Sequence, residues 1–220
     1  MTVRGIIYDM DDLLVDSHRL HIRSVEAVIE QYGRTINDIP QWLWSESMGK
    51  RLIDFLHDLV KVLDLKESVE TLNQRRSEVF LKLVEEELQP LPGALESLDL
   101  LNNHFKIGLA SSGTRKYLEM VVDRFDIRKC FQVIVSGDEV EYGKPHPEVY
   151  LTASRKLGLN ANECLVFEDA THGIRSAKEA GCKCIGVKNP NTPPQDLSEA
   201  DMVLNSLEEL TIDMVNSFQA

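Results

Sequence analysis

The sequence predicts an α/β fold, namely a doubly wound parallel sheet of the Rossmann-like kind with an inserted all-helical cap domain. Three observations lead to this prediction. Short apolar runs alternate with helical stretches over residues 89–220, as in a parallel sheet covered by helices on both faces. One more apolar run stands at residues 3–9, and it needs the later strands because an isolated parallel strand has no partner. Residues 16–88, which separate the two parts, show helical periodicity throughout.

The first apolar run, which includes Ile6 and Ile7, ends in two carboxylates, Asp9 and Asp11. Such a run is typical of a buried strand. An unpaired charge is too costly to bury within it, so both carboxylates are expected at its C-terminal end, where open α/β sheets bind ligands. Two carboxylates so close repel each other unless a cation or a shared proton lies between them, and hard oxygen ligands favour magnesium. The pair therefore predicts a metal-assisted reaction.

The segment after this strand repeats apolar residues at helical spacing. The first stripe falls at i, i+3, i+4 and i+7 and is followed by a glycine stop signal; it comprises Val25, Val28, Ile29 and Tyr32. Similar stripes run through residues 52–63 and 72–83. We therefore expect a core domain of residues 1–15 and 89–220, with a helical cap domain of residues 16–88 inserted after the first strand.

The Pro-Leu-Pro-Gly sequence at residues 90–93 marks the return to the sheet. Further strands are expected at residues 106–111, 131–136, 164–167, 184–187 and 202–204. Helices are expected between most of them, at residues 94–102, 116–125, 147–157 and 173–180. The tail, residues 205–220, is expected to form a short surface helix.

Composition excludes several classes of protein. The net charge of −12 argues against an electrostatic nucleic-acid binder. No apolar run approaches the roughly 18 residues of a membrane-spanning helix, and the N-terminus lacks the pattern of a secretory signal. The four cysteines have no Cys-x-x-Cys spacing, so buried, reduced thiols are expected. We expect a cytoplasmic protein that binds neither nucleic acid nor membrane.

Three later segments carry polar residues suited to phosphate chemistry, each where a strand end is predicted. Ser111 opens a hydroxyl-rich turn that can donate hydrogen bonds to phosphate oxygens. Lys144 lies in a loop whose prolines lower the cost of fixing an ammonium group. Glu168 and Asp169 end another strand and can complete a magnesium site. Each feature alone is common, and the weight lies in their order along the chain.

Taken together, these residues resemble the haloacid dehalogenase superfamily, in particular its subgroup of sugar-phosphate phosphatases and β-phosphoglucomutases. The resemblance covers nearly the whole chain. Its most specific strings are YDMDDLLVDS, YGKPHPEVY and FEDATHGIRSAKEAG, at residues 8–17, 142–150 and 167–181. In that family the core strand order is 5-4-1-2-3, and a helical cap is inserted after the first motif.

The resemblance implies a covalent mechanism. Asp9 is implied to be the nucleophile that forms an aspartyl-phosphate, and Asp11 the acid and base that protonates the leaving group and then activates water. Ser111 and Lys144 are implied to hold the phosphoryl oxygens, and Lys144 also moderates the negative field around Asp9.

Magnesium is the cofactor that the resemblance implies. Its ligands would be Asp9, the backbone carbonyl of Asp11, and Asp169, with Glu168 reaching the metal directly or through water. Two positions depart from the subgroup: Asp12 stands where Gly is common, and a Leu follows it. The true dehalogenases lack the second aspartate, so the presence of Asp11 disfavours carbon–halogen hydrolysis.

Specificity is expected to lie in the cap, which would close over the site and exclude water. The residues expected to contact substrate are Ser112, Gly113, His21, Gly49, Lys50 and Arg51. For two of these residues an alternative to substrate contact stays open. His21 could instead lie on the surface of a helix, and Gly49 could only end a turn. Trp42 and Trp44 are expected to pack within the cap rather than to contact substrate. Arg75 and Arg76 are expected to lie on a solvated face of their helix.

The predicted function is a magnesium-dependent phosphatase that hydrolyses a small phosphate monoester, such as a sugar phosphate. A mutase of the β-phosphoglucomutase type is an alternative, because it uses the same residues and differs only in whether water or a sugar hydroxyl accepts the phosphoryl group. A catalytically silent metabolite-binding protein is a further alternative, and the intact acidic set argues against it. The expected partner is a small phosphorylated metabolite, and a monomer is expected.

Overall fold

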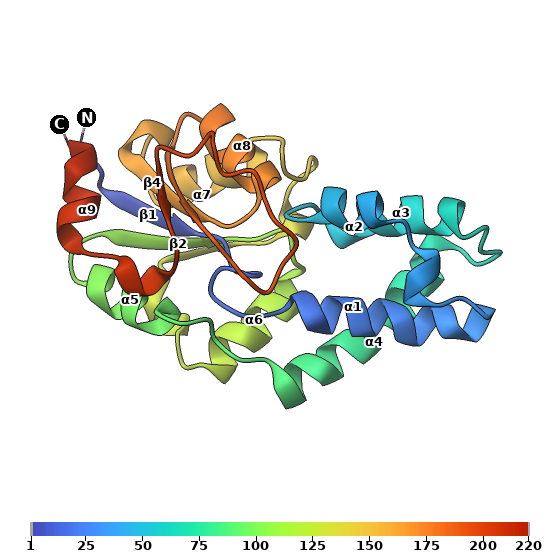
Figure 1. Cartoon of the computed structure of the whole chain (residues 1–220). Coiled ribbons are helices and arrows are strands. Elements are labelled where there is room, and N and C mark those ends of the chain that lie inside the picture. Colours follow the sequence, from blue (N-terminus) through green and yellow to red (C-terminus); the bar gives the residue numbers. More distant parts are fainter. Residues whose placement is uncertain (1, 220) are drawn as a thin grey trace.

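The structure, a computed structural model, describes residues 2–219 and contains one six-stranded parallel sheet (Figure 1). Its order is β3-β2-β1-β4-β5-β6, which confirms the expected 5-4-1-2-3 order and adds a sixth strand at the edge. The strands are β1 (Gly5–Tyr8), β2 (Lys106–Ala110), β3 (Val133–Val135), β4 (Cys164–Glu168), β5 (Lys183–Val187) and β6 (Met202–Leu204). The first strand is central, because it pairs with both β2 and β4.

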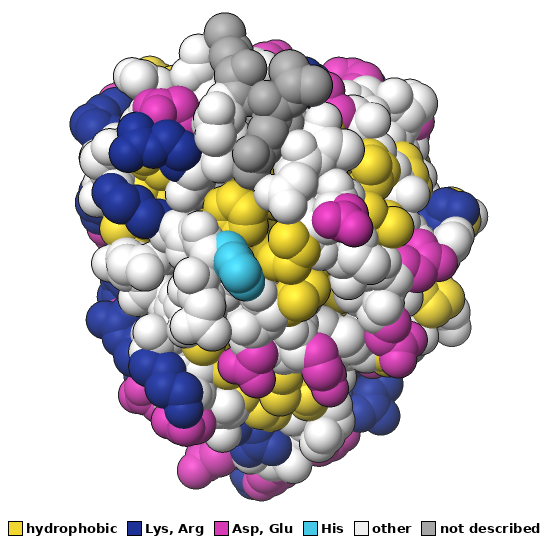
Figure 2. All heavy atoms as spheres, turned by 90° about the vertical axis from the view of Figure 1, so that its left-hand side faces the viewer, with side chains coloured by type: hydrophobic (Ala, Val, Ile, Leu, Met, Phe, Trp, Pro, Cys, Tyr) yellow, Lys and Arg dark blue, Asp and Glu magenta, His cyan; other side chains and the backbone are white. Residues whose placement is uncertain are grey.

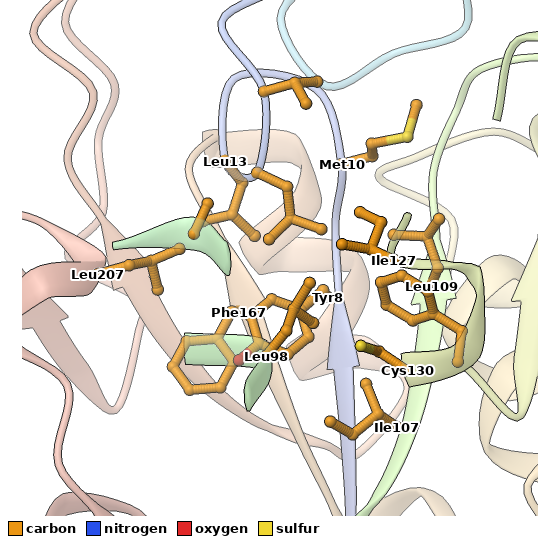
Figure 3. Close-up of a cluster of buried hydrophobic side chains, with 14 of the residues drawn as sticks. Tyr8, Met10, Leu13, Leu98, Ile107, Leu109, Ile127, Cys130, Phe167 and Leu207 are labelled. Atoms are coloured by element: carbon orange, nitrogen blue, oxygen red, sulfur yellow. The ribbon is translucent and has the colours of Figure 1, made fainter. Parts of the chain in front are cut away.

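Helices cover both faces of this sheet, as the alternating pattern predicted. One face is covered by α7 (Glu148–Lys156) and α8 (Thr171–Glu179), and the other by α5 (Ala94–Asn102) and α6 (Arg115–Arg124). Alternate residues of β1 serve the two faces: Ile6 and Tyr8 join one hydrophobic cluster and Ile7 the other. Figure 3 shows the first cluster, in which the Tyr8 ring stacks on Phe167 at 4.9 Å. The confirmed fold class is thus a doubly wound α/β core.

The inserted segment is all-helical and projects from one side of the sheet (Figure 1). Its helices are α1 (His18–Ile29), α2 (Gln41–Ser47), α3 (Leu52–Val62) and α4 (Val69–Glu87), with short 3-10 turns between α1 and α2. They share a hydrophobic cluster of their own, which includes Val25, Phe55, Leu59 and Leu72. At the sheet end, Leu20 and Phe80 instead pack into the core cluster, so the two parts are continuous there.

One expectation about burial was wrong. Arg76 was interpreted as solvated, but it is only 2% exposed because it occupies the buried stripe of α4 between Leu72 and Phe80. The tail contains a short helix, α9 (Ile212–Asn216), whose Val215 is fully buried against the core while its other residues are partly or fully exposed. All four cysteines are free and buried, as expected.

The face opposite the inserted helices carries both chain termini (Figures 1 and 2). Lys and Arg side chains gather mainly along the left of this face in Figure 2, Asp and Glu side chains lie mostly on the right and below, and hydrophobic side chains are exposed near its centre. Within residues 2–219, no helix combines the length and the apolar character needed to cross a membrane.

Candidate active site

The motif residues meet at the C-terminal edge of the sheet because their strands are neighbours. Asp9 follows β1, and Glu168 and Asp169 stand at the end of the adjacent β4. Ser111 follows β2 on the other side of β1, and its hydroxyl donates to Asp11 Oδ2 at 3.1 Å. Parallel strands place their carboxyl ends at one edge, so residues far apart in the sequence converge.

Lys144 bridges two of these carboxylates. Its Nζ lies 2.5 Å from Asp9 Oδ1 and 2.7 Å from Glu168 Oε1, and the lysine side chain is 1% exposed. Burial lowers the pKa of Lys144, but the charges of Asp9 and Glu168 outweigh burial and raise that pKa above its usual range. The ammonium therefore stays charged and offsets part of the negative charge around Asp9.

Glu168 is held from three directions and is fully buried. Besides Lys144, its carboxylate accepts hydrogen bonds from the Tyr150 hydroxyl at 2.8 Å and from the Ala170 amide at 2.9 Å. Gly173 makes room for it, since a Cβ there would lie 1.6 Å from Glu168 Oε1. Sequence reasoning did not identify Tyr150 or the need for Gly173, because both depend on where the Glu168 side chain turns.

Asp9, Glu168 and Asp169 offer oxygen atoms that lie within 4.8 Å of one another. All three residues are buried, and Asp169 Oδ2 has no hydrogen-bond partner. Burial, followed by the charges of neighbouring carboxylates, raises the pKa of Asp169 well above its usual range. An unpaired buried oxygen within a group of hard carboxylate ligands fits a divalent cation such as magnesium. The Asp11 side chain does not belong to this group of oxygen atoms.

The Asp11 side chain accepts hydrogen bonds from several donors. Ser17 Oγ lies 2.8 Å and Tyr117 Oη 2.7 Å from Asp11 Oδ1, with His21 Nε2 at 3.6 Å. Burial raises the pKa of Asp11, but the contacts with His21, Tyr117 and Ser17 outweigh burial and lower that pKa to about 2. Tyr117, on α6, is a contact that sequence reasoning missed.

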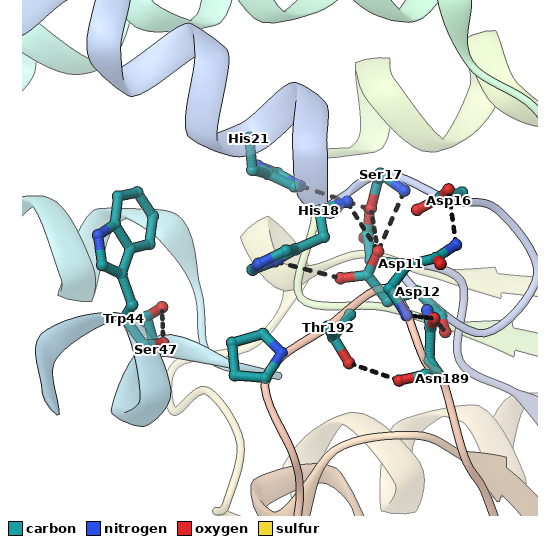
Figure 4. Close-up of polar contacts among 12 residues, drawn as sticks. Asp11, Asp12, Asp16, Ser17, His18, His21, Trp44, Ser47, Asn189 and Thr192 are labelled. Atoms are coloured by element: carbon teal, nitrogen blue, oxygen red, sulfur yellow. Dashed lines mark hydrogen bonds and ion pairs between the residues drawn. The ribbon is translucent and has the colours of Figure 1, made fainter. Parts of the chain in front are cut away.

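His21, which Figure 4 shows near Asp11, also contacts two residues of α4 in the inserted segment. Its Nδ1 accepts a hydrogen bond from the buried Arg76 guanidinium, and its ring stacks on Phe80 at 4.2 Å. A guanidinium can only donate, so Nδ1 is the acceptor and the ring proton sits on Nε2, facing Asp11. Burial and the Arg76 charge lower the pKa of His21 to about 4, which keeps the ring neutral.

The structure shows why Asp can stand at position 12, where the family commonly has Gly. Its backbone has a φ of 62°, in the left-handed region that favours Gly. Its carboxylate accepts hydrogen bonds from the Ser17 amide at 3.1 Å and the His18 amide at 2.8 Å, at the start of α1. Ser17, at the N-cap position, makes no side-chain capping bond of its own. Asp12 thus caps α1 from the loop that follows β1.

A cavity opens over Asp9, Asp11 and Asp169 and reaches the inserted helices. Six residues expected to contact substrate line this cavity: His21, Gly49, Lys50, Arg51, Ser112 and Gly113. Two contacts fasten its rim, since Ser112 Oγ donates to the Gly49 carbonyl at 2.7 Å and Arg51 donates to the Glu141 carbonyl at 3.1 Å. Ser111, Lys144 and Glu168 are instead buried behind the cavity wall.

The two tryptophans and Arg75 lie in different surroundings. Trp42 is 51% exposed, whereas Trp44 lines the cavity and also packs against Phe55, with ring centroids 4.9 Å apart. Packing was therefore only part of the role of Trp44. Arg75 reaches the Tyr32 hydroxyl at 3.2 Å and stays outside the cavity wall, as expected.

Comparisons with known proteins agree on one family. The family model described as haloacid dehalogenase-like hydrolase matches residues 6–187. The chain is 35% identical to hexitol phosphatase B of Escherichia coli K12, with 95% of each chain covered. It is 31% identical to the phosphorylated carbohydrates phosphatase of Thermotoga maritima, covering 94% of this chain and 100% of the relative.

The fold matches solved structures over the same extent. The crystal structure of β-phosphoglucomutase from Clostridium difficile superimposes with a TM-score of 0.85, covering 99% of this chain and 97% of that chain at 22% identity. At 22% identity this similarity supports the fold alone. The match of the family model over most of the sequence, together with relatives above 30% identity along their full length, shows that this chain belongs to the haloacid dehalogenase-like hydrolases.

Proposed function

We propose that this protein is a magnesium-dependent phosphatase that hydrolyses a small phosphate monoester, a sugar phosphate, through an aspartyl-phosphate on Asp9. One observation carries the proposal. Asp9 faces the cavity, contacts the Lys144 ammonium, and shares a possible cation site with Glu168 and Asp169. The relatives named as phosphatases of hexitols and of phosphorylated carbohydrates support the substrate class.

In the first half-reaction, Asp9 Oδ bonds to phosphorus as the bond to the leaving oxygen breaks, and Asp11 gives that oxygen a proton. Magnesium, held by Asp9, Asp169 and Glu168, would supply positive charge that offsets the phosphate dianion. Lys144 and Ser111 lie next to the two aspartates, at 2.5 Å from Asp9 and 3.1 Å from Asp11, and are proposed to orient the phosphoryl oxygens.

In the second half-reaction, the Asp11 carboxylate takes a proton from water while the water oxygen bonds to phosphorus and the bond to Asp9 breaks. The donors around Asp11 favour its carboxylate form, which this step requires. In the first step Asp11 must carry a proton, and a protonated carboxyl has fewer acceptor sites than a carboxylate. Asp11 must therefore give up at least one of these hydrogen bonds and donate its own proton to the leaving oxygen instead.

We further propose that residues 16–88 act as a cap domain over a core formed by residues 1–15 and 89–220. Support comes from the separate hydrophobic cluster of the inserted helices and from the cavity between them and the sheet edge. A cap in this position would exclude bulk water from Asp9.

The test is a panel of phosphate monoesters with magnesium, read as release of inorganic phosphate. We expect turnover by the wild type, loss of turnover with EDTA, and no turnover by Asp9→Asn. Asp58→Asn is the matched control, because the Asp58 side chain is 56% exposed on α3, outside the cavity wall. Undiminished release by Asp9→Asn would contradict the covalent mechanism.

Two other outcomes would favour the alternatives. Conversion of β-glucose 1-phosphate to glucose 6-phosphate that depends on a trace of bisphosphate would establish the mutase. Magnesium binding without turnover of any monoester would establish a binding protein.

A further inference from the structure

The cavity has two chemically different ends. Asp9, Asp11 and Asp169 form one end. The wall formed by α1, α2, α3 and the turn before α3 carries four apolar side chains, Val25, Trp44, Leu52 and Phe55, together with polar ones that include His21, Ser47 and Lys50. A phosphate monoester bound at Asp9 would place its leaving group toward this wall, because the phosphoryl group must stay beside Asp9.

Trp44 is an aromatic side chain in the lining of the cavity. Its ring packs against Phe55, which also lines the cavity and is 5% exposed, with centroids 4.9 Å apart. Figure 4 shows Trp44 and Ser47 on α2 across from His18 and His21 on α1, and all four residues line the same cavity. A group that enters between these helices therefore meets a tryptophan that is already packed in place.

Several polar side chains of this wall are engaged elsewhere, and the Lys50 ammonium is the cation of the cavity lining that a polar leaving group would meet. Ser47 Oγ donates to the carbonyl of Trp44 at 2.7 Å. Arg51 is bound by the Asp54 carboxylate at 3.1 Å, and by the Glu141 carbonyl. His21 spends both ring nitrogens on Arg76 and Asp11. A polyhydroxylated chain pressed against this wall would lose hydrogen bonds to water with few replacements.

We propose that the substrate's leaving group carries a flat aromatic or heteroaromatic ring that stacks on Trp44. The heterocyclic base of a nucleoside 5′-monophosphate is a ring of this kind. The proposal rests on the proposed phosphatase function and narrows its substrate to a ring-bearing sugar phosphate. A ring needs no hydrogen bonds on its faces and gains from stacking on an aromatic side chain, so it suits this wall better than a polyol does.

The test compares ribose 5-phosphate with uridine and adenosine 5′-monophosphate, which add a base to the same phosphorylated pentose. Stacking of one base predicts a kcat/KM at least about tenfold higher for the nucleotides. Trp44→Ala should bring this ratio close to one, and Trp44→Phe should keep most of it. Trp42→Ala is the matched control, because Trp42 lies on the same helix but outside the cavity wall, and it should leave the ratio unchanged.

A binding measurement gives a second readout that does not need turnover. The chain has two tryptophans, so Trp42→Phe combined with Asp9→Asn leaves Trp44 as the only tryptophan, which can be excited selectively over the tyrosines. We expect uridine 5′-monophosphate to quench its fluorescence in the presence of magnesium, and ribose 5-phosphate to leave it nearly unchanged.

Three results would overturn the inference: equal or better turnover of ribose 5-phosphate, an equal loss on both substrates in Trp44→Ala with intact folding, or no quenching by either nucleotide. Each of these leaves the phosphatase proposal standing if other monoesters are hydrolysed. Quenching by a nucleotide without hydrolysis of any monoester would support the ring site and refute the phosphatase.

Discussion

Replacement of Lys144 by Met removes the ammonium that lies between two buried carboxylates while keeping a side chain of similar length. Asp9 and Glu168 would then face each other without a cation, at 7% and 0% side-chain exposure. Breaking a buried ion pair by removing one partner costs about 3–5 kcal/mol. We expect Lys144→Met to lower the free energy of unfolding by this amount in the absence of magnesium.

The assay is urea unfolding followed by circular dichroism at neutral pH, with EDTA and with excess magnesium. Lys156→Met is the matched control, because Lys156 also pairs with a carboxylate, Glu139, at 2.6 Å, but is 44% exposed; such pairs contribute about 1 kcal/mol or less. Magnesium should stabilise Lys144→Met more than the wild type, since it supplies the missing positive charge. Equal losses in the two Met variants, or equal gains from magnesium, would refute this reasoning.

Three further predictions concern groups outside the proposed metal ligands. Asp12→Gly should lower the free energy of unfolding by about 1 kcal/mol, because the α1 cap is lost. Asp12→Ala should lower it by roughly 1 kcal/mol more, because Ala is strained in the left-handed backbone conformation of this position. Identical melting temperatures of the two variants would exclude the strain. Tyr117→Phe should lower kcat for phosphate release about tenfold, with folding intact, because a hydrogen bond to the charged Asp11 is worth about 1.5–3 kcal/mol; steady-state kinetics against the wild type would show this, and an unchanged kcat would exclude the role. Burial raises the pKa of Glu139, but hydrogen bonds from Lys156 and Ser136 outweigh burial and bring that pKa to about 2. Its stabilising effect is therefore present above about pH 4.3, the pKa of an unfolded Glu, and lost as pH falls toward 2. Urea unfolding should show Glu139→Gln about 1 kcal/mol less stable than the wild type at pH 7, with a difference that shrinks at pH 3; a difference independent of pH would contradict this.

The cluster of polar side chains at the sheet edge was predictable from sequence because these residues directly follow apolar runs. Asp9 and Glu168 each stand at the end of a short apolar run of the kind typical of a buried strand, and parallel strands align such ends. The strand order itself came from the family resemblance, since periodicity identifies strands without saying which are neighbours.

The contacts around Asp11 were less accessible to such reasoning. Tyr117 lies on the buried face of α6, where an aromatic residue is expected for packing, and only the path of the loop brings Asp11 to its hydroxyl. Arg76 did carry a signal: it falls four residues after Leu72 and four before Phe80, within the apolar stripe of α4. A cation in such a stripe needs a buried partner, here His21.

The central position of β1 has a consequence for folding during synthesis. This strand emerges first, yet its partners β2 and β4 follow roughly 100 and 160 residues later, so it waits for most of the chain before its backbone is paired. Closing an unstructured loop of roughly 100 residues to pair β1 with β2 would cost several kcal/mol in chain entropy. Helices α1 to α4 form a compact cluster within that loop, and α1 and α4 pack against each other, which draws its two ends together. Folding of the inserted helices should therefore lower the entropy cost of pairing β1 with β2.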